Sequence, residues 1–377
     1  MKKQIIAYYG SYLMLGAVIA SLGPTLLALS DNLGVTVGAI SVLFTTRSFG
    51  YLFGSMLGGW LYDRFHGHGV LTFLLLGAAW ALSSVPNMQV MFWLSVIFFV
   101  IGITQGGVDV GANTMLVRAD PPKVGAYLNG MFFFAGLGSF LVPICLGKVS
   151  LVWGYQGIAL LLIPIAAWML LTPSPQIPVA VHSETARLNN LPLFIAFALL
   201  AFIYVGAEVT YGGWLFTYFT TSGIGSEDAA YTLNSIFWLA IMFGRLLAIP
   251  VAARFKLSRI IVGYLLGAVV SASVLYFLRA FPIAMWIGTL GMGLSMAALF
   301  PSTFTFVQKN MRFSGKLTGL VWASGSTGAM ILPYLIGQQI YRMGPASMML
   351  TMLGVWILAV GIFLVALRSR REPATVQ

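Results

Sequence analysis

Apolar segments long enough to cross a lipid bilayer occupy almost all of this sequence. A transmembrane helix needs about 20 mostly apolar residues. Of the 377 residues, 59% are hydrophobic and only 8% are charged, whereas soluble domains carry about 25% charged residues. The sequence therefore predicts an all-α membrane protein with twelve transmembrane helices, at approximately residues 5–28, 36–62, 69–86, 90–117, 123–147, 151–171, 191–219, 228–253, 258–279, 282–308, 314–340 and 344–368.

The net charge of +11 has a topological explanation. If the N-terminus is cytoplasmic, almost all loop lysines and arginines are cytoplasmic as well, and the opposite side has only Lys148, Arg279 and Arg342. This is the positive-inside bias, so we expect both termini in the cytoplasm and an integral protein of a bacterial inner membrane. The basic excess then indicates the lipid bilayer as a partner and not nucleic acid. The single cysteine, Cys145, excludes an internal disulfide.

The second half of the chain repeats features of the first at an offset of about 190 residues. At this offset Gly16 coincides with Gly206, and the run VPICLG at 142–147 coincides with LPYLIG at 332–337. The repeat predicts two six-helix pseudo-repeats, described here by three ranges: an N-terminal bundle at 1–171, a cytoplasmic linker at 172–190 and a C-terminal bundle at 191–377.

Two parallel six-helix repeats with both ends in the cytoplasm resemble the plan of the major facilitator superfamily. The segment GGWLYDRFHGH, residues 58–68, resembles the signature of that superfamily at the cytoplasmic turn between its second and third helices. The resemblance implies that Asp63 and Arg64 are conformational residues that help latch the two halves. The structural alternative is a topogenic turn with no further role.

Two other stretches resemble one branch of this superfamily, the sodium-dependent glucose transporters and the related fucose–proton symporters. YVGAEVTYGGWLFTYF at 204–219 is similar to their seventh helix, and GGVDVGANTMLV at 106–117 to their fourth. The resemblance implies cation-coupled sugar uptake with the helix-four carboxylate, Asp109 here, in coupling. Fucose symporters also use a carboxylate in the first helix, which the span 5–28 lacks.

Asp109 is also the leading candidate from the residues alone. A carboxylate at membrane depth costs roughly 2.5–3.5 kcal/mol and marks an ion or substrate path. Gln105 and Asn113 share its helical face, and Thr114 follows. Asp109 is suited to carrying a proton, or to contributing to a sodium site with Asn113 and Thr114, so the coupling ion is H+ or Na+ and no other cofactor is expected. The alternative is a structural carboxylate paired with an arginine.

Four charged residues lie well inside the predicted spans: Arg47, Asp109, Glu208 and Arg245. Their charges balance, which favours internal pairing and a neutral ligand. Glu208 either binds sugar hydroxyls or pairs with Arg245 on the next span. We interpret Arg47 and Arg245 as charge-pair or gating residues, with ligand contact as the alternative.

A sugar presents both C–H patches and hydroxyl groups, so its site needs aromatic faces and polar side chains. The candidate substrate-binding residues are Gln105, Asn129, Glu208, Trp214, Asn234, Trp238 and Trp322. Any one tryptophan also fits the interfacial belt of a membrane protein. The pattern Gly50-x3-Gly54-x3-Gly58 is interpreted as helix packing.

The function predicted from these features is cation-coupled symport of a neutral sugar by alternating access, by a monomer. The sequence has no P-loop, no nucleophile–His–Asp pattern and no metal cluster, and we place all three histidines in cytoplasmic loops, so we expect no enzyme. The alternative is a proton-coupled multidrug or organic-anion exporter of the same fold, with Arg47 and Arg245 facing the ligand. A receptor or lipid-handling protein without solute flux is the third hypothesis.

Overall fold

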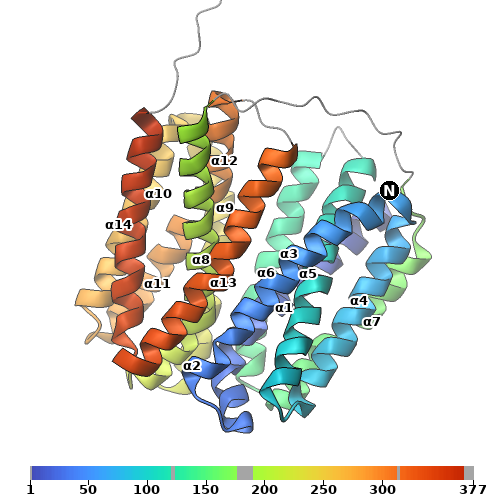
Figure 1. Cartoon of the computed structure of the whole chain (residues 1–377), viewed down its shortest axis with the longest axis horizontal. Coiled ribbons are helices and arrows are strands. Elements are labelled where there is room, and N and C mark those ends of the chain that lie inside the picture. The colour runs from blue at the N-terminus through green and yellow to red at the C-terminus, as the bar shows by residue number, and fades with distance from the viewer. Residues whose placement is uncertain (1, 120–123, 176–189, 312–314, 369–377) are drawn as a thin grey trace, which may run out of the picture.

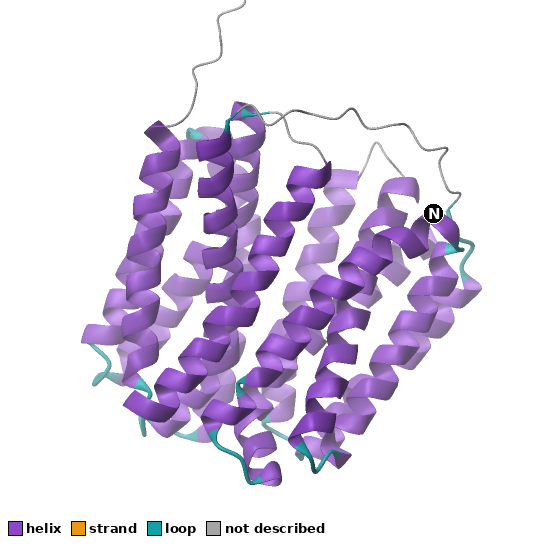
Figure 2. Cartoon of the chain, viewed as in Figure 1, coloured by secondary structure: helices purple, strands orange, loops and turns teal. Residues whose placement is uncertain are grey.

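The computed structural model describes residues 2–119, 124–175, 190–311 and 315–368, and all regular elements in these ranges are helices (Figure 2). The α-helices are α1 (Lys2–Leu33), α2 (Val37–Ile40), α3 (Val42–Arg64), α4 (Gly67–Ser84), α5 (Met91–Ala119), α6 (Val124–Leu146), α7 (Leu151–Leu171), α8 (Leu191–Thr221), α9 (Glu227–Arg254), α10 (Leu257–Phe277), α11 (Pro282–Met296), α12 (Leu299–Asn310), α13 (Gly315–Met343) and α14 (Ala346–Arg368). A short 3-10 turn, Val85–Asn87, follows α4.

The prediction of an all-α protein with twelve membrane crossings is confirmed, and each predicted span coincides with helix. Two spans are interrupted: 36–62 comprises α2 and α3, and 282–308 comprises α11 and α12. Eleven helical stretches in the described residues are long and apolar enough to cross a membrane. The remaining crossing, α3, has 23 residues but is less apolar because it includes Arg47, Asp63 and Arg64.

Glycines bring α3 and α5 into direct backbone contact, as their spacing indicated. A methyl group on Gly54 would overlap the backbone of Ile103, and one on Gly106 would overlap the carbonyl of Tyr51. The contact is therefore reciprocal, with glycines on both helices. Such close approach lets van der Waals packing hold helices together where the surrounding lipid offers no hydrophobic driving force.

The same helix crossings recur at the offset of the sequence repeat. Gly16 of α1 packs against the carbonyl of Ala135 on α6, and Gly206 of α8 packs against the carbonyl of Gly328 on α13. Gly16 and Gly206 are 190 residues apart, and their partners Ala135 and Gly328 are 193 residues apart. The repeated residues therefore make equivalent contacts in the first and second halves of the chain.

Figure 1 shows α1 to α7 on one side of the molecule and α8 to α14 on the other, with the N-terminus and the end of α14 at the same end of the bundle. Several contacts between the two sets lie at the opposite end. Lys148 pairs with Asp228 at 3.2 Å, and Gln338 donates to the carbonyl of Gly38 at 2.7 Å. A methyl group on Gly23 would overlap the α8 backbone.

The loop assignment of His68 is wrong. His68 lies in the first turn of α4 and is only 3% exposed. Its Nδ1 is 2.7 Å from the carbonyl of Thr172 and its Nε2 is 2.8 Å from the hydroxyl of Tyr8. The ring therefore connects α1, α4 and the end of α7. His66 is exposed before α4, as a loop residue would be, and His182 lies outside the described residues.

We expect Gly54→Ala to lower the free energy of unfolding by about 1–3 kcal/mol, because the added methyl must push α3 away from α5. Thermal unfolding of the purified protein in detergent measures this change. Gly59→Ala on the same helix is the matched control, since no atom outside its own helix lies within 4 Å of the added methyl. Equal midpoints for the two variants would contradict the close crossing.

Candidate functional site

Asp109 lies where α1, α3 and α5 converge, and uncharged side chains hold its carboxylate. The hydroxyl of Tyr12 donates to Oδ1, the hydroxyl of Tyr51 donates to Oδ2 at 2.5 Å, and Asn113 Nδ2 donates to Oδ1 at 3.1 Å. Asn113 also donates to the hydroxyl of Tyr12. Both carboxylate oxygens are therefore hydrogen-bonded by neutral donors from three helices.

The glycine crossings explain how these donors reach the carboxylate. Gly106, one turn before Asp109 on α5, lies against the α3 backbone at Tyr51. Because no side chain intervenes, Tyr51 can extend along α5 to Oδ2. On α1, Gly16 is one turn after Tyr12 and packs against α6 in the same way. The local sequence thus sets the helix separation that the hydrogen bonds require.

The structure brings together only part of the predicted coupling set. Asn113 bonds to Asp109, whereas the described hydrogen bonds of Asp109 include neither Thr114 nor Gln105. Gln105 is 7% exposed and lines a narrow apolar pocket between α1, α4 and α5. On this predicted face of α5, Asp109 and Asn113 therefore make the hydrogen bonds to the neighbouring helices α1 and α3.

Sequence reasoning missed Tyr12 and Tyr51. A buried phenol usually needs a hydrogen-bond partner, so a tyrosine inside an apolar span was the available signal. That signal does not say which carboxylate the phenol meets. The alternative, in which Asp109 pairs with an arginine, does not match its described contacts. Arg47 is 6% exposed and donates to the carbonyl of Ile19 at 3.2 Å instead.

A second charged group lies in the C-terminal helices. Arg245 of α9 approaches Glu208 of α8, with 4.0 Å between Nη2 and Oε1, and their side chains are 31% and 18% exposed. Arg245 Nε also donates to the carbonyl of Ala297 at 3.3 Å. This carbonyl is available as an acceptor because the residue four positions later, Pro301, has no N–H to donate to it. The geometry thus matches the hypothesis that Glu208 pairs with Arg245.

Three further candidates are buried on α8 and α9, and one of them, Trp214, also packs against Phe44 of α3. Trp214 is wholly buried, and its Nε1 donates to the carbonyl of Pro333 at 2.9 Å. Asn234 is also wholly buried and donates to the carbonyl of Gly212 at 2.8 Å, while Trp238 is 7% exposed. No ligand has access to these side chains in this conformation.

The remaining candidates lie near surfaces. Asn129 of α6 is exposed, and Trp322 of α13 is 49% exposed. Asp63 forms an ion pair with Arg118 of α5 at 3.0 Å. The guanidinium of Arg64 lies 4.7 Å from the ring centre of Trp60. The signature turn therefore joins α3 to α5 through Asp63.

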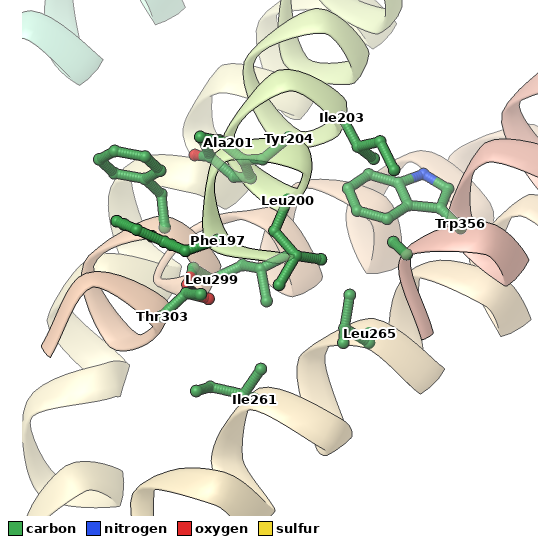
Figure 3. A pocket seen from close by; sticks show the side chains of 12 residues that line it. Phe197, Leu200, Ala201, Ile203, Tyr204, Ile261, Leu265, Leu299, Thr303 and Trp356 are labelled. Atoms are coloured by element: carbon green, nitrogen blue, oxygen red, sulfur yellow. Dashed lines mark hydrogen bonds between the residues drawn. The ribbon is translucent and has the colours of Figure 1, made fainter. Parts of the chain in front are cut away.

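A narrow apolar pocket lies among α8, α10, α12 and α14 (Figure 3). Side chains such as Phe197, Leu265 and Trp356 line it. Thr303 and Tyr204 contribute its few polar atoms. A sugar requires several converging polar groups, so this pocket does not coincide with the predicted sugar site.

The crossings, the internal repeat and the buried charged groups define a helical membrane transporter fold. Residues 8–333 match the profile of the Major Facilitator Superfamily, and the chain belongs to this superfamily. This confirms the resemblance on which the sequence analysis relied.

Relatives with similar sequences include members of the expected branch. The chain is 31% identical to sodium-dependent glucose transporter 1 of Xenopus laevis over 355 residues, which cover 85% of this chain and 72% of the relative. It is 30% identical to sodium-dependent glucose transporter 1 of Homo sapiens over 376 residues, covering 87% and 71%. A crystal structure of a variant of the nucleoside transporter NupG shares the fold, with a TM-score of 0.81 at 12% identity over 97% of this chain and 98% of that chain.

We expect Glu208 and Arg245 to be energetically coupled, since Nη2 and Oε1 lie 4.0 Å apart and both side chains are partly buried. Unfolding midpoints of Glu208→Gln, Arg245→Met and the double variant form a double-mutant cycle. The expected coupling is about 1 kcal/mol. Strictly additive effects of the two substitutions would show that the 4.0 Å approach does not stabilise the protein.

Proposed function

We propose that this protein is a secondary active transporter that couples the movement of a neutral sugar to that of a cation by alternating access. The single observation that carries the proposal is the partly buried carboxylate of Asp109, held by Tyr12, Tyr51 and Asn113 without an arginine partner among its described contacts. A carboxylate at membrane depth that is not spent on a permanent ion pair remains free to bind and release a cation. The names of the glucose-transporting relatives support the sugar.

The two moving bodies in this proposal are an N-terminal bundle at 1–171 and a C-terminal bundle at 191–377, joined by the linker 172–190. The equivalent glycine crossings of the first and second halves support this division. In this proposal both termini lie in the cytoplasm of a bacterial cell, and the positive-inside charge pattern supports their orientation. Contacts between the halves at the far end then correspond to an inward-facing state, in which Asp63 pairs with Arg118 inside the N-terminal bundle and not across to the other half.

The coupling ion in this proposal is a proton. The three side chains on Asp109 all direct hydrogen-bond donors at the carboxylate. A sodium site needs converging acceptor oxygens, such as free carbonyls of an unwound helix, and α5 continues as a helix through residue 109. The relatives are named sodium-dependent, which supports sodium instead of a proton. The experiment therefore tests a proton gradient and a sodium gradient separately.

The charge balance favours a neutral ligand over an organic anion. Arg245 approaches Glu208, and Arg47 donates to a backbone carbonyl. An anion exporter requires at least one arginine that is free for the ligand. The residues we assign to the sugar are Gln105, Asn129, Glu208, Trp214, Asn234, Trp238 and Trp322. In this proposal the transport cycle must expose Trp214, Asn234 and Trp238, which are buried in this conformation. The transporting unit is a monomer in the bilayer.

The test is uptake of radiolabelled glucose, galactose and fucose into proteoliposomes under an imposed proton or sodium gradient. We expect a proton gradient to drive accumulation in the wild-type protein. Asp109→Asn should reduce accumulation to equilibration while sugar exchange continues, because the site no longer carries a proton but still binds sugar. Asp31→Asn, at the exposed end of α1, is the matched control and should accumulate sugar normally.

Full accumulation by Asp109→Asn would remove this residue from coupling. Accumulation driven by sodium alone would reassign the ion. If carboxylates, and not hexoses, compete for uptake, the exporter hypothesis replaces sugar symport.

A further inference from the structure

Phe132 of α6 lies between the two charged groups of the protein. Its ring meets the ring of Tyr12 edge to face, with 6.1 Å between centres and 74° between planes. The guanidinium carbon of Arg245 lies 5.3 Å from the centre of the Phe132 ring. Contacts therefore run without interruption from Asp109 through Tyr12, Phe132 and Arg245 to Glu208.

The exposed part of Phe132 faces the space between the halves and not the lipid. Its side chain is 41% exposed, and Arg245, which lies over the ring, is 31% exposed. A guanidinium directed into hydrocarbon would be strongly unfavourable. The ring and Arg245 thus share a surface that water or a polar ligand reaches.

The sequence repeat gives Phe132 an aromatic counterpart. Adding the repeat offset of 190 leads from Phe132 on α6 to Trp322 on α13. Trp322 is 49% exposed and packs against Phe300 of α12, with ring centres 5.4 Å apart. Since α6 and α13 make equivalent glycine contacts with α1 and α8, the two aromatic side chains occupy equivalent positions in the two halves.

We infer that Phe132 is the stacking surface that the N-terminal half provides for the sugar, with Trp322 as its equivalent in the other half. The inference rests on the proposed sugar transport. A pyranose has an apolar C–H face that fits an aromatic ring, and hydroxyls that fit a neighbouring carboxylate and guanidinium. Arg245 lies over the Phe132 ring and approaches Glu208, so this pair supplies these groups.

The same arrangement links sugar binding to Asp109. Tyr12 packs against Phe132 with its ring and donates to Asp109 with its hydroxyl. A sugar that orders the Phe132 ring therefore orders Tyr12 as well. Tyr12 is a positioning residue in this scheme, because it acts on the carboxylate and does not need to contact the sugar.

The first experiment compares uptake by Phe132→Leu, Phe132→Tyr and the control Phe133→Leu in proteoliposomes. Leucine keeps an apolar side chain but removes the aromatic face, so we expect the KM for sugar to rise about tenfold. Phe132→Tyr keeps the face and should retain a KM within about twofold of the wild type. Phe133 contacts Phe134 on its own helix and should tolerate leucine. A wild-type KM for Phe132→Leu would overturn the inference.

The second experiment does not depend on transport rates. Cys145 is the only cysteine, so Cys145→Ser provides a background in which Phe132→Cys or Phe133→Cys carries the single thiol. We expect saturating sugar to slow labelling of Phe132→Cys by a small maleimide at least about fivefold, without affecting Phe133→Cys. Unchanged labelling of Phe132→Cys, in a background that transports sugar, would overturn the inference. Absence of sugar flux in the wild-type protein would instead refute the proposed function.

Discussion

The function we propose depends on one constraint: a carboxylate inside a membrane must find its hydrogen-bond donors within the protein. No water is available in the hydrocarbon to solvate it, and each unsatisfied polar group costs several kcal/mol. Glycine allows the donors to come close, because Gly54 and Gly106 let the backbones of α3 and α5 touch. At this separation Tyr51 reaches Asp109. The packing of the helices and the hydrogen bonding of the site therefore depend on the same glycine residues.

The sequence repeat also gives equivalent close contacts between the two halves of the molecule. Gly147 of the N-terminal half faces Tyr231 of the other half, and Gly337 faces Ser41 in the reverse sense. All four positions are related by the offset of 190 residues. Two halves that meet through equivalent surfaces can exchange one set of contacts for another without breaking either bundle, which is the motion that alternating access requires.

Part of the site was predicted from the sequence, and the residues that were predicted belong to types that are rare inside the apolar spans. Only a few charged residues interrupt the apolar spans, so Asp109, Glu208 and Arg245 stood out. Phenylalanine and tyrosine occur 27 and 15 times, so Tyr12 and Phe132 did not. His68 was assigned to a loop because the polar turn before α4 hid the start of the helix. Its burial depends on Thr172, more than a hundred residues away.

The sequence by itself determined the number of crossings, their approximate bounds, the repeat and the few charges that lie among apolar residues. These are properties of each segment along its own axis, and hydropathy measures them directly. The tertiary structure alone decided that two tyrosines hold Asp109, that Arg245 lies between Glu208 and Phe132, and that Trp214 and Asn234 are enclosed. Those contacts depend on how each helix is rotated and tilted against its neighbours, which packing sets and apolar length does not.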